Sequence, residues 1–143
     1  MIMEKSKQDD TTASGLLSDV QMILIDTSIW ISLFRNTNTE IGQKMWCLTA
    51  ENKAALCGQV WVEYIGGFRK SEERKKHQAS LKIFPFLDTP QVAYQKAADL
   101  LASHPRLSAG DAIIAATALH HKISLFTLDK DFSELVSEGL SLY

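Results

Sequence analysis

The stretch QMILIDTSIWI, residues 21–31, indicates how this chain begins to fold. Its first half is a compact apolar run that ends at Asp26, and such a run predicts a short strand covered on both faces. Its second half, continued through SLF to residue 34, predicts a helix that starts just after the acid. The position of Asp26 at this junction raises the question of what a carboxylate does there.

Strand and helix patterns alternate along the rest of the chain. Ser108 is the expected N-cap of a long helix, with Asp111 at its third position as in a capping box. Strands that alternate with helices predict an α/β domain, a mainly parallel sheet with helices on both faces. The expected strands are 21–26, 54–58, 85–90, 123–129 and 140–143, and the expected helices are 28–34, 39–52, 60–68, 72–84, 91–103, 108–122 and 130–139.

The composition predicts one domain after a polar tail. The chain has 143 residues, of which 45% are hydrophobic, a size typical of single domains. Residues 1–20 are polar and account for the formal net charge of −2, so we expect a flexible tail there and a domain over residues 21–143. Any affinity for a polyanion must then come from a local patch or a metal ion.

Cysteine usage and hydropathy point to the cytoplasm. Cys47 and Cys57 form no CxxC pair and lie among apolar residues, which favours reduced core thiols over a disulfide. No apolar run reaches the ~18 residues that a membrane span needs, and the first residues lack the apolar centre of a secretory signal. We expect a cytoplasmic protein with no membrane contact.

Four acids from separate parts of the chain are expected to meet at one edge of the sheet. Asp26 and Asp129 stand at the carboxyl ends of predicted strands, Asp111 opens a helix, and Glu63 lies on the helix that follows the second strand. Ligand sites of open parallel sheets lie outside the carboxyl ends of the strands. The pattern therefore predicts a crevice lined by four carboxylates.

Such a cluster requires a cation, because converging carboxylates repel one another and destabilise the fold. Hard divalent ions prefer oxygen ligands, and Mg²⁺ keeps waters that can orient a phosphate. A metal held by carboxylates can polarise a phosphodiester and activate a water. The four acids thus favour metal-dependent phosphodiester chemistry.

From Met22 to Tyr143 the sequence resembles the PIN domain, and within it the VapC-type toxins of bacterial toxin–antitoxin pairs. The segments that carry the resemblance are LIDTSIWI, GQVWVEYIGGFR with Glu63, SAGDAIIAATALHHKISLFTLDKDF and the terminal GLSLY. The resemblance implies a three-layer α/β/α fold around a central, mainly parallel sheet. It also implies a homodimer, and a VapB-like antitoxin whose C-terminal segment lies across the acidic crevice.

The resemblance further implies an endoribonuclease that cuts a structured cellular RNA, such as a transfer RNA. Asp26, Glu63, Asp111 and Asp129 match the acidic positions that hold Mg²⁺ or Mn²⁺ and act in catalysis. Asp131 is an alternative for the fourth acid, and Asp129 is favoured because it is nearer to the strand end. Whether one or two metal ions bind stays open.

Simpler readings exist for each acid taken alone. Asp26 could cap the following helix, Asp111 could interact only with the helix dipole, and Glu63 could be a surface residue. The conjunction of four acids at one sheet edge favours the metal site instead. A non-catalytic PIN domain that binds RNA or protein is the alternative function. A haloacid-dehalogenase-like phosphatase is excluded because Ser28 stands where the second aspartate of that motif belongs.

Other residues have two readings each. Thr27 and Ser28 could orient a metal-bound water or contact a substrate phosphate, or serve as helix caps. A basic run could track an RNA backbone or form a solvated helix face; it consists of Arg69, Lys70, Arg74, Lys75, Lys76 and Lys82. The histidines lack zinc spacing and are expected to be structural or exposed. Three tryptophans are expected to be core or interface aromatics: Trp30, Trp46 and Trp61.

Overall fold

The computed structural model describes residues 21–143, and the tail predicted over residues 1–20 lies outside the described residues. Four strands form one parallel sheet. Leu56 and Cys57 pair with the strand at one edge of this sheet. The strands are β2 (Ile23–Ile25), β3 (Ala54–Cys57), β4 (Phe86–Leu87) and β5 (Ser124–Phe126). They are arranged in the order β4-β3-β2-β5, which confirms the predicted parallel sheet.

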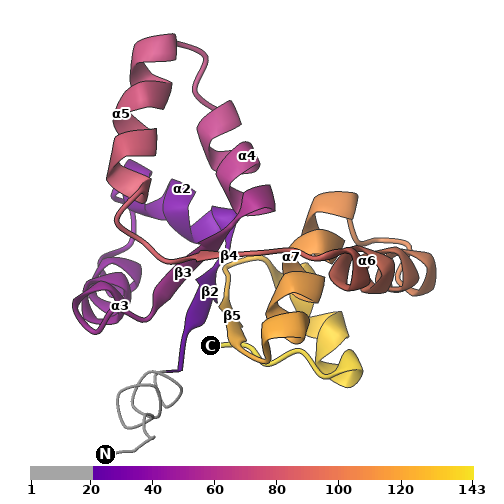
Figure 1. The fold of residues 1–143 in the computed structure, drawn as a ribbon. Helices are drawn as coiled ribbons and strands as arrows, with labels where there is room; N and C mark the ends of the chain where they lie inside the picture. Colours follow the sequence, from indigo (N-terminus) through magenta and orange to yellow (C-terminus); the bar gives the residue numbers. More distant parts are fainter. Residues whose placement is uncertain (1–20) are drawn as a thin grey trace, which may run out of the picture.

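Helices cover the sheet on both sides and extend beyond its carboxyl edge (Figure 1). The helices are α2 (Thr27–Arg35), α3 (Thr39–Ala50), α4 (Gly58–Gly66), α5 (Ser71–Leu81), α6 (Gln91–Ser103), α7 (Ala109–His121) and the 3-10 helix η1 (Lys130–Glu138). Figure 1 shows α2 and α3 on one side of the sheet and α6 and α7 on the other, while α4 and α5 form a hairpin that projects past the strand ends. The predicted three-layer α/β/α fold is confirmed.

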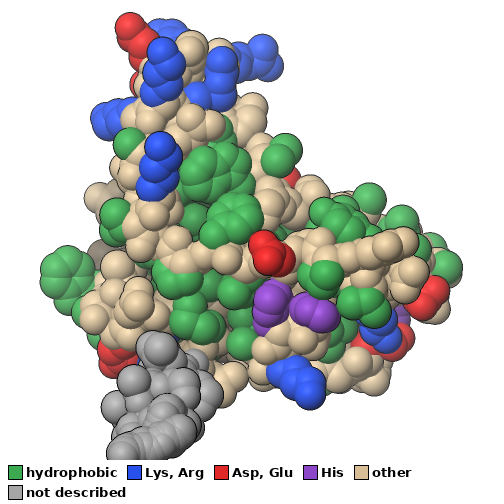
Figure 2. Space-filling model, viewed as in Figure 1, with side chains coloured by type: hydrophobic (Ala, Val, Ile, Leu, Met, Phe, Trp, Pro, Cys, Tyr) green, Lys and Arg blue, Asp and Glu red, His purple; other side chains and the backbone are tan. Residues whose placement is uncertain are grey.

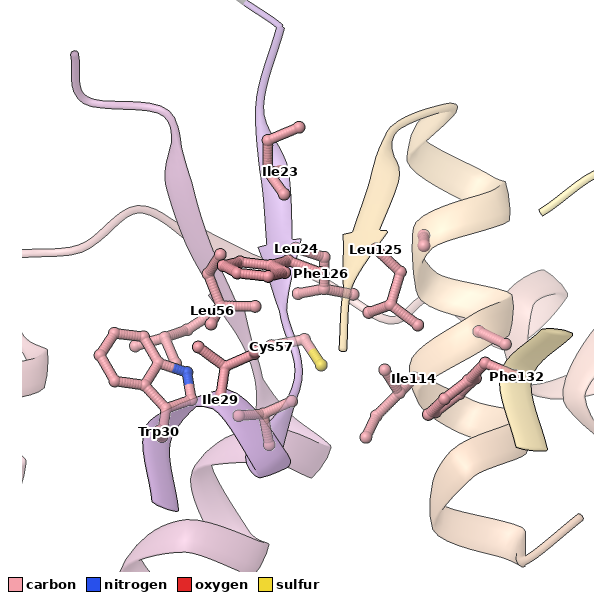
Figure 3. Close-up of a cluster of buried hydrophobic side chains, with 14 of the residues drawn as sticks. Ile23, Leu24, Ile29, Trp30, Leu56, Cys57, Ile114, Leu125, Phe126 and Phe132 are labelled. Atoms are coloured by element: carbon pink, nitrogen blue, oxygen red, sulfur yellow. The ribbon is translucent and has the colours of Figure 1, made fainter. Parts of the chain in front are cut away.

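The central strands are short and buried on both faces. Every residue of β2 and β3 is buried, as expected for strands of a sheet covered by two helical layers. Side chains from α2 and α7 join them in one core, which Figure 3 shows. Leu24, Ile29, Ile114 and Phe132 are all fully buried there. This core fixes where the strand ends lie.

Capping residues begin the helices that lead away from the strand ends. Asp26 is the N-cap of α2, and Ser108 is the N-cap of α7 with its hydroxyl accepting a hydrogen bond from the backbone N–H of Asp111 at 3.1 Å. Side-chain oxygens at N-caps satisfy backbone donors that a helix start leaves unpaired. The predicted cap at Ser108 is confirmed, and Asp26 caps α2 as well.

On α3 the structure excludes two residues that were predicted for the core. The buried stripe consists of Ile41, Met45 and Leu48 as expected, but Trp46 is 77% exposed and Cys47 is also exposed. Successive helical residues are separated by about 100°, so both side chains turn away from this narrow stripe. Trp46 is thus not part of the core, and its predicted role as an interface aromatic stays a prediction. The prediction of a core thiol is wrong for Cys47, and of the two free thiols only Cys57 is buried.

The C-terminal segment also differs from its prediction. Residues 140–143 form no full strand: the described structure has one isolated parallel bridge, between Leu125 and Leu142. Backbone hydrogen bonds from Leu125 to Ser141 and from Tyr143 to Leu125 hold this end beside β5. Among residues 21–143, no helix is long and apolar enough to cross a membrane.

Candidate active site

Four elements bring the predicted acids to the carboxyl edge of the sheet. Asp26 directly follows β2, and Asp129 lies three residues beyond β5 as the N-cap of η1. Asp111 is in the first turn of α7, and Glu63 is in the second turn of α4. The parallel strands end on one side, so the helices and caps that follow them share that side.

Asp26 is held in a fixed position by hydroxyl groups. It is 4% exposed, and its Oδ2 accepts hydrogen bonds from Ser28 Oγ at 2.7 Å and from Thr127 Oγ1 at 2.8 Å. The backbone N–H of Ser28 adds a longer contact of 3.3 Å. Within residues 21–143, Asp26 Oδ1 accepts no hydrogen bond, so one carboxylate oxygen stays free for a ligand.

Glu63 is held by neighbours on two helices. Its Oε1 accepts a hydrogen bond from Thr27 Oγ1 at 2.6 Å, and its Oε2 accepts one from Gln59 Nε2 at 2.8 Å. A Cβ atom added at Gly110 would collide with Glu63 Oε2 and Gln59 Nε2. The absence of a side chain at Gly110 therefore lets Glu63 approach the start of α7, next to Asp111.

The charge state of Asp111 indicates that the four carboxylates are within electrostatic reach of one another. Burial, the largest cause, and the negative charges of Asp129, Asp26 and Glu63 together raise the pKa of Asp111 from 3.8 to about 6, although the Ser108 hydrogen bond acts to lower it. A raised carboxyl pKa means that the charged form is disfavoured at this position. A bound cation would remove the penalty.

The structure favours Asp129 over Asp131 as the fourth acid. The backbone N–H of Asp129 donates to Thr127 Oγ1 at 2.9 Å, which ties it to the hydroxyl that also holds Asp26. Asp131 is exposed, donates its backbone N–H to Asp129 Oδ1, and has no part in the pKa shift of Asp111. Asp129 thus faces the acidic edge.

The donor set fits a hard divalent ion in its chemistry. Every functional atom is a carboxylate or hydroxyl oxygen, the ligand type that Mg²⁺ and Mn²⁺ prefer. In residues 21–143 as they stand, no three His, Cys, Asp or Glu side chains are grouped closely enough to hold a metal ion. Glu63 gives both oxygens to Thr27 and Gln59, so ligation by Glu63 would exchange these hydrogen bonds for the ion.

Sequence patterns missed three residues that shape this edge. Thr127 bridges Asp26 and the backbone of Asp129, Gln59 holds Glu63, and Gly110 makes room for it. The only available signal was that Thr127 lies two residues before Asp129. Thr27 and Ser28 were identified, and their hydroxyls bind Glu63 and Asp26, so both belong to the carboxylate network.

The basic run lies on α5 and the turn before it. Figure 2 shows lysine and arginine side chains gathered at the far end of the α4–α5 hairpin. Arg74 donates to the backbone carbonyl oxygens of Phe68 and Arg69 at 2.7 and 2.8 Å and so stabilises this turn. Lys75 and Lys76 are exposed. Contact between these lysines and RNA stays a prediction.

Comparison with known proteins shows similarity to one protein family over most of the chain. The family model described as PIN domain matches residues 23–137. Ribonuclease VapC10 of Mycobacterium tuberculosis is 31% identical over 116 residues, which cover 76% of this chain and 83% of the relative. A toxin–antitoxin complex from Klebsiella pneumoniae contains a chain with a TM-score of 0.65 and 30% identity, over 78% of this chain and 90% of that one. A DNA-bound VapBC structure from Salmonella typhimurium shares the fold, with a TM-score of 0.72, 18% identity, and coverage of 86% and 97%.

Proposed function

Because this chain belongs to the PIN-domain family, we propose that it is a VapC-type endoribonuclease and the toxin of a toxin–antitoxin pair. One observation carries the proposal: carboxylates from three other elements, Asp26, Glu63 and Asp129, all raise the pKa of Asp111 at the carboxyl edge of the sheet. Acids that only cap helices or face solvent need no such convergence. The reaction is the hydrolysis of phosphodiester bonds in a cellular RNA.

Asp26, Glu63, Asp111 and Asp129 are the proposed ligands of Mg²⁺ or Mn²⁺. When bound, such an ion polarises a phosphodiester and lowers the pKa of water. The raised pKa of Asp111, caused by burial and by the neighbouring carboxylates, supports a site that gains stability from a cation. Asp26 Oδ1, which accepts no hydrogen bond within residues 21–143, is available to bind it.

The protein's own contribution is to position these ligands. Ser28 and Thr127 hold Asp26 in one orientation, and Gly110 allows Glu63 to approach α7. Groups that orient metal ligands typically raise affinity or activity by about 10–100-fold. Thr27 and Ser28 are also the proposed substrate contacts, since their hydroxyls lie beside the carboxylates that would face the phosphate.

The proposed protein partner is a VapB-like antitoxin. The relative from Klebsiella pneumoniae was solved as a toxin–antitoxin complex. This chain has a hollow of about 430 Å³ between α4 and the residues after α5, lined by Trp61, Val62 and Phe86 among others. Figure 2 shows hydrophobic side chains gathered on this face of the hairpin.

A homodimer is part of the same proposal, and sedimentation analysis of the purified chain would test it.

RNA cleavage by wild type and Asp26→Asn tests the function directly. Total RNA is incubated with each protein in Mg²⁺, in Mn²⁺ and in EDTA. We expect cleavage by wild type with a metal ion, none in EDTA, and a loss of at least ~100-fold in Asp26→Asn, because one metal ligand is neutralised. Asp99→Asn, an exposed change on α6, is the matched control.

Expression in bacteria gives an independent readout. Wild type should arrest growth, whereas Asp26→Asn should not. RNA binding without cleavage under every metal condition, together with normal growth, would support the non-catalytic PIN domain instead. Cleavage in EDTA would contradict the metal-dependent mechanism.

A further inference from the structure

A hollow beside Glu63 is not used by the carboxylate network. It has a volume of about 250 Å³ and lies where the second halves of α2 and α4 pack together, with Glu63 in its wall. The other lining residues are aromatic, aliphatic and cationic: Ile31, Phe34, Arg35, Tyr64, Gly67 and Phe68. The hollow therefore adjoins the candidate active site directly.

Phe34 lines this hollow with an exposed aromatic ring. Its ring centroid lies 5.2 Å from those of both Phe68 and His77, at interplanar angles of 83° and 77°. Phe68 and His77 are themselves stacked, with centroids 4.1 Å apart and an interplanar angle of 7°. Equal distances to a stacked pair place Phe34 beside the pair, with its ring nearly perpendicular to both rings. No aromatic ring of residues 21–143 stacks in parallel on Phe34, and Phe34 is 54% exposed.

Positive charge borders the same hollow. Arg35 is exposed and forms no ion pair within residues 21–143. Arg69 and Lys70 directly follow Phe68 and are exposed as well. These cations complement a phosphate backbone. The hollow at Trp61 and Phe86 differs, because its lining is nearly all apolar apart from Lys82.

We propose that the hollow beside Glu63 holds one unpaired nucleobase of the RNA, stacked on Phe34, while Arg35 binds the phosphate next to that base. The proposal rests on the ribonuclease function proposed above. An aromatic side chain can stack only with a base that has left the duplex. The volume is below the ~300–1,000 Å³ of pockets for larger ligands, which suits a single ring system. With a base seated there, its neighbouring phosphodiester lies close to the carboxylates.

Binding of a single-stranded and a double-stranded probe tests the stacking role of Phe34. The probe is a short unstructured oligoribonucleotide with a fluorescent label, alone or annealed to its complement, in EDTA so that no cleavage occurs. Phe34→Leu keeps apolar bulk but removes the π face, and should weaken single-strand binding by roughly tenfold. Phe34→Trp should keep the affinity. Trp46→Leu is the matched control, since Trp46 is an exposed aromatic on α3.

The salt dependence of binding tests Arg35. Each lost phosphate contact flattens the log–log salt slope by about 0.7 for a single strand. Arg35→Gln should show this change, and Lys53→Gln should not, because Lys53 precedes β3 at the opposite edge of the sheet. An unchanged slope in Arg35→Gln would remove the phosphate contact from the proposal.

Two outcomes would overturn the base-binding role. In one, Phe34→Leu binds the single strand as tightly as wild type. In the other, it loses single-strand and duplex affinity equally. Failure of the nuclease function can be distinguished from failure of the base-binding role. In that case wild type would cleave no RNA with Mg²⁺ or Mn²⁺, although Phe34→Leu would still bind single strands more weakly than wild type. Conversely, Phe34→Leu could cleave RNA normally, with an unchanged KM and unchanged cut sites. This result would contradict the base-binding role of the hollow and would leave the proposed nuclease function intact.

Discussion

The Thr127 hydroxyl connects two acids that are far apart in sequence. It donates a hydrogen bond to Asp26 Oδ2 at 2.8 Å and accepts one from the backbone N–H of Asp129 at 2.9 Å. The orientation of Asp26 therefore depends on a residue 101 positions away. At the scale of residues, the site is a set of carboxylates aimed by neighbouring hydroxyls rather than a set of acids alone.

Replacing Thr127 tests this positioning. Thr127→Val keeps the shape but removes both hydrogen bonds, so we expect metal affinity and cleavage to fall by about 10–100-fold. Thr127→Ser restores the hydroxyl and should recover most of the activity. The measurements are the metal-ion dependence of cleavage and isothermal titration with Mn²⁺. Equal activity in Thr127→Val and wild type would show that Asp26 needs no such support.

Asp111 predicts a pH-dependent stability in the absence of metal. Its pKa is about 6 in the folded chain, against 3.8 for an ordinary aspartate. The folded state therefore holds the proton more tightly, and stability contributed by this group falls as the pH rises from about 4 to about 6. Proximity to the N-terminus of α7 favours a negative charge, but burial and the other carboxylates outweigh it.

Thermal melts in EDTA check whether the stability contributed by Asp111 falls as the pH rises. Asp111→Asn should melt at a higher temperature than wild type at pH 7.5, and the gap should shrink towards pH 4, where Asp111 is neutral. Asp99→Asn, on the exposed face of α6, controls for the general loss of a charge. Destabilisation of Asp111→Asn at pH 7.5 would instead mean that the carboxylate serves mainly to begin the helix.

At the scale of elements, an ionic cluster ties η1 to the turn after α6. His104 Nε2 lies 3.0 Å from Glu138 Oε2, and His104 Nδ1 lies 3.4 Å from Glu134 Oε1. Arg106 pairs with Glu134 at 2.8 Å, and Lys96 approaches Glu138 at 3.9 Å. η1 begins just after Asp129, and the turn leads to Asp111 on α7. The cluster thus joins the two segments that carry these acids.

The cluster predicts a stabilisation that is lost at high pH. Hydrogen bonding to Glu138, followed by that to Glu134, raises the pKa of His104 above its usual 6.5. The stabilisation is complete below the unfolded-state pKa and disappears as the pH rises through the higher folded-state pKa. His104→Gln should therefore lower the melting temperature most near pH 5.5 and least above about pH 8. His120→Gln, a change at an exposed residue, is the control and should show no such trend. If His104→Gln lowered the melting temperature equally at every pH, His104 would contribute through packing and not through its charge.

At the scale of the whole molecule, the sheet brings distant segments together at one acidic edge. β2 is central, with β3 and β5 as its parallel neighbours, so the chain leaves all three strands on the same side. Ligand crevices of open parallel sheets form there for this reason. The core below, which includes Leu24, Leu56 and Leu125, is fully buried and holds the strands in register.

Metal binding should stabilise the whole domain. A ligand that binds only the folded state adds about 2.7 kcal/mol at a concentration 100 times its Kd. For a domain of this size, that corresponds to a rise in melting temperature on the order of 5–10 °C. We expect this rise with Mg²⁺ or Mn²⁺ and a much smaller one in Asp26→Asn. Equal rises in both proteins would place the ion elsewhere.

Local signals were sufficient for most of the elements and for the positions of the acids along them. The predicted helix 91–103 is α6 with the same limits, and Ser108 caps α7 as expected. The apolar run before Asp26 forms β2. Helical periodicity, capping and short buried strands depend on residues within a few positions of one another, so the sequence contains them. The likeness to PIN domains added the expectation of an endoribonuclease with a VapB-like antitoxin.

Only the tertiary structure decided which neighbours hold each acid. Thr127 reaches Asp26 from another strand end, and Gly110 admits Glu63 because α7 and α4 approach closely. The single bridge at Leu142 was likewise unpredictable from local patterns. Each depends on how tightly separate elements pack, and close packing determines which faces meet. The sequence by itself therefore determined the four acids and their elements, whereas contacts between elements decided their orientation and charge.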